Sequence, residues 1–223
     1  MTRKHLILDF DSTLVEVEAL DELAALALAR RPNGAAIVAE IARITDLGMQ
    51  GKMPIDESLQ RRLSLLDAGK ADVEAVVGLL KRRITASFRA NAAFFDRNRN
   101  RIYVISNGFK DYIVPVVAEL FIDSAKVFAN TFIYGTDGRI VGYDEENLLA
   151  RAGGKSKQLL ALDLAGDIYV VGDGYTDFQM TDTGRVTKFI AYTGNVNRPS
   201  VTQRADHVVD NFDEFISLGY CAD

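Results

Sequence analysis

The chain has 223 residues, a formal net charge of -5 and 48% hydrophobic residues. This length supports one sizeable domain, or one domain with a smaller insert. The acidic balance argues against a nucleic-acid partner, which would require a basic face. The two histidines, His5 and His207, are far apart in the sequence, so any metal should be a hard cation bound by oxygen. The single cysteine, Cys221, leaves no disulfide framework.

The sequence has no apolar run that is long enough for a secretory signal or a membrane span. We therefore expect a cytoplasmic protein without a membrane partner. The composition leaves the oligomeric state open.

The first expected strand ends in two carboxylates separated by one residue. Residues 6–8 are apolar without a helical period, which is typical of a strand buried on both faces, and Asp9 and Asp11 follow directly. Ligands of an open parallel sheet bind beyond the carboxyl ends of its strands, and carboxylates this close require a cation or a proton between them. The alternative is an ordinary turn that caps the next helix. This stretch alone leaves both open, and Ser12 and Thr13 are expected to cap the turn in either case.

Residues 15–84 carry helical patterns and almost no strand signal. The expected helices cover residues 18–29, 35–47, 55–66 and 72–84. Four short helices inserted directly after a first strand indicate a lid beside the mouth of a sheet. The alternative is that all four belong to the main core.

Beyond residue 84, strands and helices alternate. Pro115 predicts a kink or restart in the helix that begins near Phe109, and residues 135–138 predict a hairpin turn. The alternation predicts an α/β fold, a Rossmann-like doubly wound parallel sheet with a small inserted four-helix cap. The strands are expected at 101–106, 126–134, 139–143, 167–171, 188–192 and 207–209, with a helix at 154–164.

Polar residues also follow two later strands. Residues 106–108, Ser-Asn-Gly, offer a hydroxyl and backbone N–H groups to a phosphate oxygen. Asp173 and Asp177 add carboxylates, and Lys155 begins a helix between these two segments. Carboxylates and a lysine that converge without thiols or imidazoles indicate a Mg²⁺ site next to an anion. Each feature alone is more often a cap or a turn, but their joint occurrence at strand ends favours a site.

The same residues resemble the ordered motifs of haloacid-dehalogenase-like phosphatases. The resemblance is carried by Asp9-Phe10-Asp11-Ser12-Thr13, Ser106, Lys155 and residues 172–177. Shorter strings resemble phosphoserine phosphatases, and the first two of them resemble the cap of those enzymes. These strings lie at residues 49–53, 58–63, 127–130, 142–145, 153–157 and 194–196.

The resemblance implies a core of residues 1–14 and 85–223 and a helical cap of residues 15–84. It also implies magnesium-dependent hydrolysis of a phosphomonoester through a phosphoaspartyl intermediate. Asp9 would be the nucleophile, and Asp11 would be the general acid and then the general base. Mg²⁺ would be held by Asp9, Asp173 and the backbone carbonyl of Asp11, with Asp177 acting through a water molecule.

The remaining site residues follow from the same resemblance. The substrate would be L-phosphoserine, which would yield L-serine and phosphate as the last step of serine biosynthesis. Glu18 would accept hydrogen bonds from its ammonium group, and Arg62 would hold its carboxylate. Taken alone, Glu18 is better explained as an acidic residue near a helix start, and Arg62 as a solvated helix charge. The phosphate- and substrate-binding set is Ser106, Asn107, Gly108, Lys155, Thr176, Glu18, Met49 and Arg62.

Some positions depart from the family pattern. Asn107 stands where glycine is usual, and Ile55 stands where the cap often carries an aromatic residue. These departures leave two enzymatic alternatives open: a phosphatase of the same type with another small phosphorylated metabolite, and a phosphotransferase. A non-catalytic phospho-aspartate switch module is a minor alternative, because such a module needs neither a helical lid nor a second acidic pair.

Overall fold

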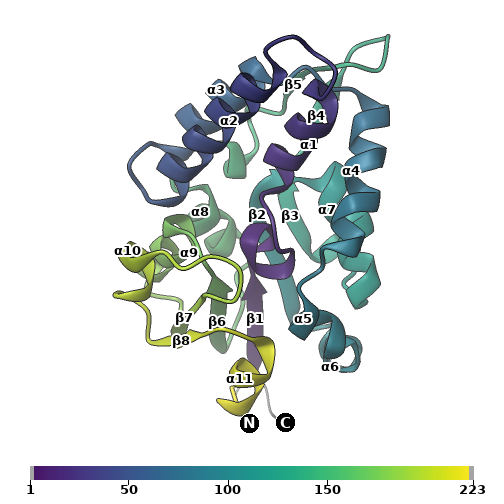
Figure 1. Ribbon diagram of the computed structural model, residues 1–223. Coiled ribbons are helices and arrows are strands. Elements are labelled where there is room, and N and C mark those ends of the chain that lie inside the picture. Colours follow the sequence, from purple (N-terminus) through teal and green to yellow (C-terminus); the bar gives the residue numbers. More distant parts are fainter. Residues whose placement is uncertain (1–2, 221–223) are drawn as a thin grey trace.

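The computed structural model describes residues 3–220 and has a parallel sheet at its centre (Figure 1). Its strand order is β3-β2-β1-β6-β7-β8, and every neighbouring pair is parallel. The chain therefore builds outward from β1 in both directions, which leaves a crevice beyond the carboxyl end of β1. The strands are β1 (Lys4–Leu8), β2 (Ile102–Phe109), β3 (Val127–Asn130), β6 (Asp167–Gly172), β7 (Lys188–Tyr192) and β8 (His207–Val209).

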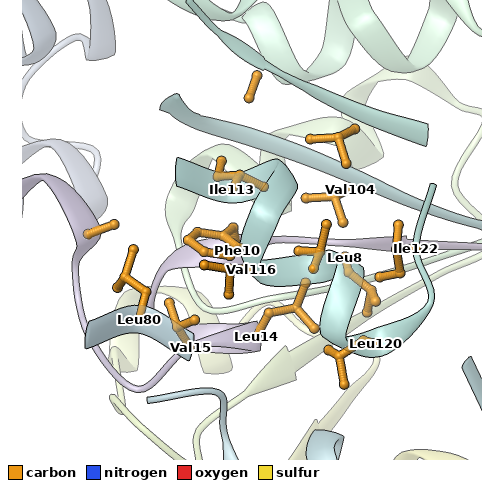
Figure 2. Packing of buried hydrophobic residues seen from close by; sticks show 14 of the residues in the cluster. Leu8, Phe10, Leu14, Val15, Leu80, Val104, Ile113, Val116, Leu120 and Ile122 are labelled. Atoms are coloured by element: carbon orange, nitrogen blue, oxygen red, sulfur yellow. The ribbon is translucent and has the colours of Figure 1, made fainter. Parts of the chain in front are cut away.

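Both faces of the sheet are buried, as the apolar strand sequences predict. Leu8 and Val104 point into a core shared with the helix α7 (Lys110–Val117), whereas Ile7 and Val170 point into a second core on the opposite face. Figure 2 shows Leu8 and Val104 packed near Ile113 and Val116 of α7. The core helices are α5 (Ala86–Ala90), α6 (Ala92–Asn98), α7 (Lys110–Val117), α8 (Gly154–Ala161), α9 (Tyr175–Phe178), α10 (Pro199–Thr202) and α11 (Phe212–Ser217).

Four helices lie beyond the carboxyl ends of the strands, at the top of Figure 1. The chain leaves and re-enters the core through paired segments, because Val15 bridges Ile84 and the Thr85 N–H donates to the Leu14 carbonyl at 3.0 Å. A separate antiparallel hairpin reaches the same layer, and its Ile140 N–H donates to the Ala68 carbonyl at 2.9 Å. These elements are α1 (Ala19–Leu28), α2 (Gly34–Met49), α3 (Ile55–Leu65), α4 (Lys70–Arg82), β4 (Phe132–Tyr134) and β5 (Ile140–Tyr143).

The α/β class, the parallel sheet and the hairpin are confirmed, and several boundaries differ from the expected ones. The expected strand at 126–134 is two strands, of which β3 joins the main sheet and β4 forms the hairpin with β5. The strand expected to end at Ser106 continues to Phe109, which pairs with Asn130 beyond an irregularity in the register. Pro115 does not interrupt α7, which runs to Val117 before it tightens into a short 3₁₀ turn.

Within residues 3–220, no helix combines the length and the apolar character that crossing a membrane requires. Cys221 lies outside the described residues.

Candidate active site

The turn after β1 is held by the Asp9 side chain. Asp9 is 2% exposed, and its Oδ1 accepts the Phe10 N–H at 2.7 Å at the start of a tight helical turn (Phe10–Leu14). The expectation that Ser12 and Thr13 cap this turn is wrong, because Asp9 takes that role. The Ser12 hydroxyl instead donates to Glu18 at 2.7 Å, and the Thr13 hydroxyl donates to Asp173 at 3.1 Å. Both hydroxyls therefore orient carboxylates around the crevice.

Lys155 lies between two of the buried carboxylates. Its Nζ is 2.7 Å from Asp9 Oδ1 and 2.7 Å from Asp177 Oδ1, and the whole side chain is buried at the start of α8. Burial lowers the pKa of Lys155, but Asp177 and Asp9 outweigh it, so the pKa lies above its usual range. Burial and the nearby Asp9 raise the pKa of Asp177, with Lys155 acting against them. Lys155 thus stays charged and partly offsets the repulsion between the two carboxylates.

Asp173 completes a cluster of three buried carboxylates. Asp9, Asp173 and Asp177 each offer an oxygen within 4.8 Å of the others. A Cβ at Gly172 would lie 2.4 Å from Cγ of Asp177, so only glycine lets β6 end this close to that carboxylate. A donor set of oxygens alone matches a hard cation such as Mg²⁺. The residues therefore fit the magnesium site expected from the sequence.

Asp11 projects from the same turn toward the cavity. Its Oδ1 accepts the Ala19 N–H at the start of α1, at 2.7 Å. Burial raises the pKa of Asp11 well above its usual range, and the nearby Glu18 and Asp9 raise it further. This environment favours the protonated carboxyl, which is the form that a general acid requires.

The end of β2 forms another wall. The Gly108 N–H donates to the Ser106 hydroxyl oxygen at 2.9 Å, which leaves the hydroxyl proton available to a ligand. Asn107, the departure from the family pattern, donates its side-chain amide to the Leu149 carbonyl at 2.7 Å. Its own carbonyl accepts the Asn130 side chain at 2.8 Å. The Asn107 amide is therefore tied to the core at the cavity wall.

The cap contributes the opposite wall. Arg62 is 7% exposed, and it donates through Nη1 to the Thr45 hydroxyl at 3.2 Å and through Nε to the Ser58 carbonyl at 3.4 Å. A cation fixed in this way is neither a mobile nor a solvated helix charge. It lines the same cavity as Glu18 and Met49.

Most of the predicted site residues meet around one cavity between the core and the cap. The volume of this cavity that is open to water-sized molecules is only about 20 Å³. Asp173 and Asp177 lie in the carboxylate cluster with Asp9. Thr176 lines a neighbouring groove instead, and its buried hydroxyl has no hydrogen-bond partner among the described residues. The predicted residues lining the cavity are Asp9, Asp11, Glu18, Met49, Arg62, Ser106, Asn107, Gly108 and Lys155.

Sequence reasoning missed Arg198 and Tyr112. Arg198 is 7% exposed; it forms an ion pair with Asp173 through Nη1, and its Nη2 lies 3.3 Å from Glu18 Oε1. It follows the string at residues 194–196 that was singled out, but its partners lie far away in the sequence. Tyr112 lines the cavity from the start of α7. In the sequence it is indistinguishable from an ordinary core aromatic residue.

Comparisons with known proteins agree with this geometry. The chloroplastic phosphoserine phosphatase of Arabidopsis thaliana is 32% identical over 213 residues, which cover 94% of this chain and 69% of that protein. A crystal structure of a phosphoserine phosphohydrolase-like protein from Francisella tularensis subsp. tularensis SCHU S4 superposes with a TM-score of 0.88 at 30% identity, covering 97% of this chain and 99% of that one. A phospho-aspartyl intermediate analogue of phosphoserine phosphatase superposes with a TM-score of 0.76 at 27% identity, covering 98% and 99%.

The order of the motifs along the chain agrees with the same assignment. The family model described as haloacid dehalogenase-like hydrolase matches residues 6–182, a span that runs from β1 past the Asp173 and Asp177 carboxylates. This chain belongs to the haloacid dehalogenase-like hydrolase family.

Proposed function

We propose that this protein is a magnesium-dependent phosphatase that hydrolyses L-phosphoserine to L-serine and phosphate. The observation that carries the proposal is a single cavity with a buried carboxylate–lysine cluster on its core wall and a fixed Arg62 on its cap wall. The first half suits a phosphate with a metal ion, and the second suits a small anionic group beyond the phosphate. The names of the similar proteins, phosphoserine phosphatases, support the same substrate.

The metal would be held by the Asp9 and Asp173 carboxylates and the Asp11 carbonyl, with Asp177 holding a metal-bound water. Bound there, Mg²⁺ supplies positive charge that offsets repulsion between the nucleophile and the phosphate dianion. The buried donor cluster, which contains oxygen alone, supports this assignment.

Asp9 is the nucleophile. Lys155 and the Phe10 N–H both bind its Oδ1, so Oδ2 is the oxygen left free to attack phosphorus in line. The attack forms a phosphoaspartyl group on Asp9 and releases the serine alkoxide. Because one oxygen is fixed by two donors, the nucleophile is oriented before the substrate arrives.

Asp11 moves the proton. Its raised pKa keeps a proton available for the leaving alkoxide, and the resulting carboxylate then takes a proton from the water that hydrolyses the aspartyl phosphate. Lys155, Ser106 and the backbone N–H groups near Gly108 bind the transferring phosphate oxygens. Thr176, at the neighbouring groove, is assigned to the same phosphate end because its buried hydroxyl has no hydrogen-bond partner within residues 3–220.

The cap binds the carboxylate and ammonium groups of the substrate. Arg62 holds the carboxylate, and Glu18 accepts from the ammonium group. Residues 15–84 form this cap, which joins the core through the paired segments at Val15 and Ile84. Since the cavity leaves about 20 Å³ of free space, substrate entry requires the cap to move away from the core.

A substrate panel with a matched pair of variants tests the proposal. With Mg²⁺ present, kcat/KM should be highest for L-phosphoserine and lower by about 10-fold or more for O-phosphoethanolamine, which lacks the carboxylate and so loses a charge-assisted hydrogen bond. Arg62→Ala should remove this preference. Arg61→Ala, which changes a neighbouring exposed arginine paired with Glu57, should keep it.

Two results would contradict the proposal. A sugar phosphate or phosphoglycolate that exceeds phosphoserine by orders of magnitude overturns the substrate, and an unchanged preference in Arg62→Ala overturns the role of Arg62. Transfer of the phosphoryl group to an acceptor other than water would identify a phosphotransferase.

A further inference from the structure

One polar group in the cavity wall has no hydrogen-bond partner in the described part of the chain. Tyr112 lies in α7 and is fully buried, and its hydroxyl forms no hydrogen bond with any described residue. The Phe109 N–H lies close enough to the hydroxyl oxygen to lower the pKa of Tyr112, but without the geometry of a hydrogen bond, and among residues 3–220 the hydroxyl proton has no acceptor. An unpaired buried hydroxyl is unfavourable, so its retention at a cavity wall points to a ligand.

The hydroxyl lies beside the groups assigned to the chemistry. A Cβ built at Gly108 would be 2.9 Å from Tyr112 Oη and 3.1 Å from Asp11 Oδ2, so both oxygens lie close to the same face of Gly108. Asp11 Oδ1 is occupied by the Ala19 N–H, which leaves Oδ2 to face the leaving group. Tyr112 therefore stands next to the place where the ester oxygen and the atoms beyond it must lie.

The charges around Tyr112 identify which part of the substrate it faces. Burial and the neighbouring Asp11 raise the pKa of Tyr112 well above its usual range, Arg62 acts in the opposite direction, and Glu18 contributes to the rise. The hydroxyl therefore keeps its proton at neutral pH and can donate a hydrogen bond. Among these neighbours, Arg62 is the cation, and it lines the same cavity as Tyr112. An anion bound by Arg62 in this small cavity is therefore expected beside the hydroxyl.

We propose that Tyr112 is a substrate-contacting residue whose hydroxyl donates a hydrogen bond to the carboxylate that Arg62 holds. A carboxylate has more lone pairs than one guanidinium uses. A second donor from the core can therefore bind the substrate carboxylate together with Arg62 of the cap. The contact joins core and cap through the substrate. This inference rests on the proposed phosphoserine phosphatase activity and adds a second specificity residue to it.

The test compares Tyr112→Phe with the wild-type protein on L-phosphoserine and on O-phosphoethanolamine. Loss of one hydrogen bond to a charged group should lower kcat/KM for phosphoserine by about 10-fold or more, mainly through KM. The value for O-phosphoethanolamine should stay within about twofold, because the missing contact is one that this substrate never makes. The melting temperature should equal or exceed that of the wild type, since the change removes an unpaired hydroxyl and no hydrogen bond.

Tyr103→Phe is the matched control. Tyr103 is also buried, but its hydroxyl accepts from Lys126 at 3.0 Å near the opposite end of β2. Its removal should lower the melting temperature and leave the preference between the two substrates unchanged.

The outcomes separate the two proposals. If the wild-type protein does not prefer phosphoserine, the proposed function fails and the role of Tyr112 fails with it. If the preference exists but Tyr112→Phe loses activity equally on both substrates, Tyr112 acts on the phosphate or on Asp11, and the carboxylate contact is overturned. An unchanged KM for phosphoserine overturns it as well.

Discussion

At the scale of single residues, Arg62 is positioned by a chain of polar groups inside the cap. Its guanidinium donates to Thr45, and the Thr45 hydroxyl donates to Asp21 Oδ1 at 2.7 Å. Burial raises the pKa of Asp21 from 3.8 to about 6, and the nearby Glu18 adds to the shift. Asp21, which ends this series of hydrogen bonds, therefore lowers the stability of the fold when its carboxylate is charged.

The sign of that cost follows from proton linkage. The pKa of Asp21 is higher in the folded state than in the unfolded state, so the folded protein binds the proton more tightly. Stability contributed by the protonated form is complete below pH 3.8, falls as the pH rises toward 6, and is absent above it. Since one pKa unit corresponds to about 1.4 kcal/mol, the charged carboxyl costs up to about 2–3 kcal/mol at neutral pH.

We predict that Asp21→Asn raises the free energy of unfolding by about 1–2 kcal/mol at pH 8 and has little effect near pH 3.5, because the amide does not ionise. Urea unfolding of the two proteins across this range measures the difference. Asp96→Asn changes an exposed carboxylate that is paired with Arg99, and it should stay within about 0.5 kcal/mol throughout. A difference for Asp21→Asn that does not vary with pH would contradict the linkage.

At the scale of elements, the cap meets the core where α2 ends. Gly51, just beyond α2, has a φ of +72°, and a Cβ there would lie 2.6 Å from the ring of Tyr175 at the start of α9. The Met49 side chain approaches Gly174 in the same contact. Glycine at these positions lets the cap rest directly on the loop that carries Asp173 and Asp177.

We predict that Gly51→Ala lowers kcat/KM for the substrate by about 10-fold or more, because the added methyl group pushes the cap away from the core and displaces Arg62 by more than a positioned group tolerates. Steady-state kinetics measures this loss. The left-handed conformation should also cost about 1 kcal/mol of stability.

Gly184→Ala separates the two effects. Gly184 has a φ of +67° and nothing within 4 Å of the added carbon, so this variant has the same strain without the collision. It should lose similar stability and retain activity. Equal kinetic losses in both variants would show that the contact between Gly51 and Tyr175 does not set cap closure.

At the scale of the whole molecule, the buried carboxylates should link the stability of the fold to the binding of a metal ion. Asp9, Asp173 and Asp177 are all buried, and the cations in contact with them are Lys155 and Arg198. Negative charge therefore exceeds positive charge within this cluster. A divalent cation that binds only the folded cluster should stabilise the whole fold.

We predict that Mg²⁺ at about 100 times its dissociation constant raises the free energy of unfolding by about 2.7 kcal/mol, and that EDTA reverses the rise. Thermal unfolding at increasing Mg²⁺ measures the shift without relying on activity. Asp173→Asn should abolish the shift, whereas Asp182→Asn on the neighbouring 3₁₀ turn should keep it. A shift that persists in Asp173→Asn would place the metal elsewhere.

Features that depend on neighbouring residues are predictable from the sequence, whereas features that depend on contacts between distant segments are not. The apolar run before Asp9, the helical periods of residues 15–84 and the turn at residues 135–138 are local patterns, so the sequence predicts the fold class and the strand-end carboxylates. Strand lengths depend on partners. β2 extends past Ser106 because Asn130 pairs with Phe109, and that pairing is not visible in β2 itself.

By itself, the sequence determined the fold class and predicted which residues would carry the chemistry, because carboxylates, a lysine and a serine at strand ends are local and ordered motifs. Only the tertiary structure decided which charges meet. The ion pair of Arg198 with Asp173 and the approach of Tyr112 to the Asp11 side of the cavity each join segments that are distant along the chain. Such contacts depend on the packing of whole helices and loops, for which no local pattern exists.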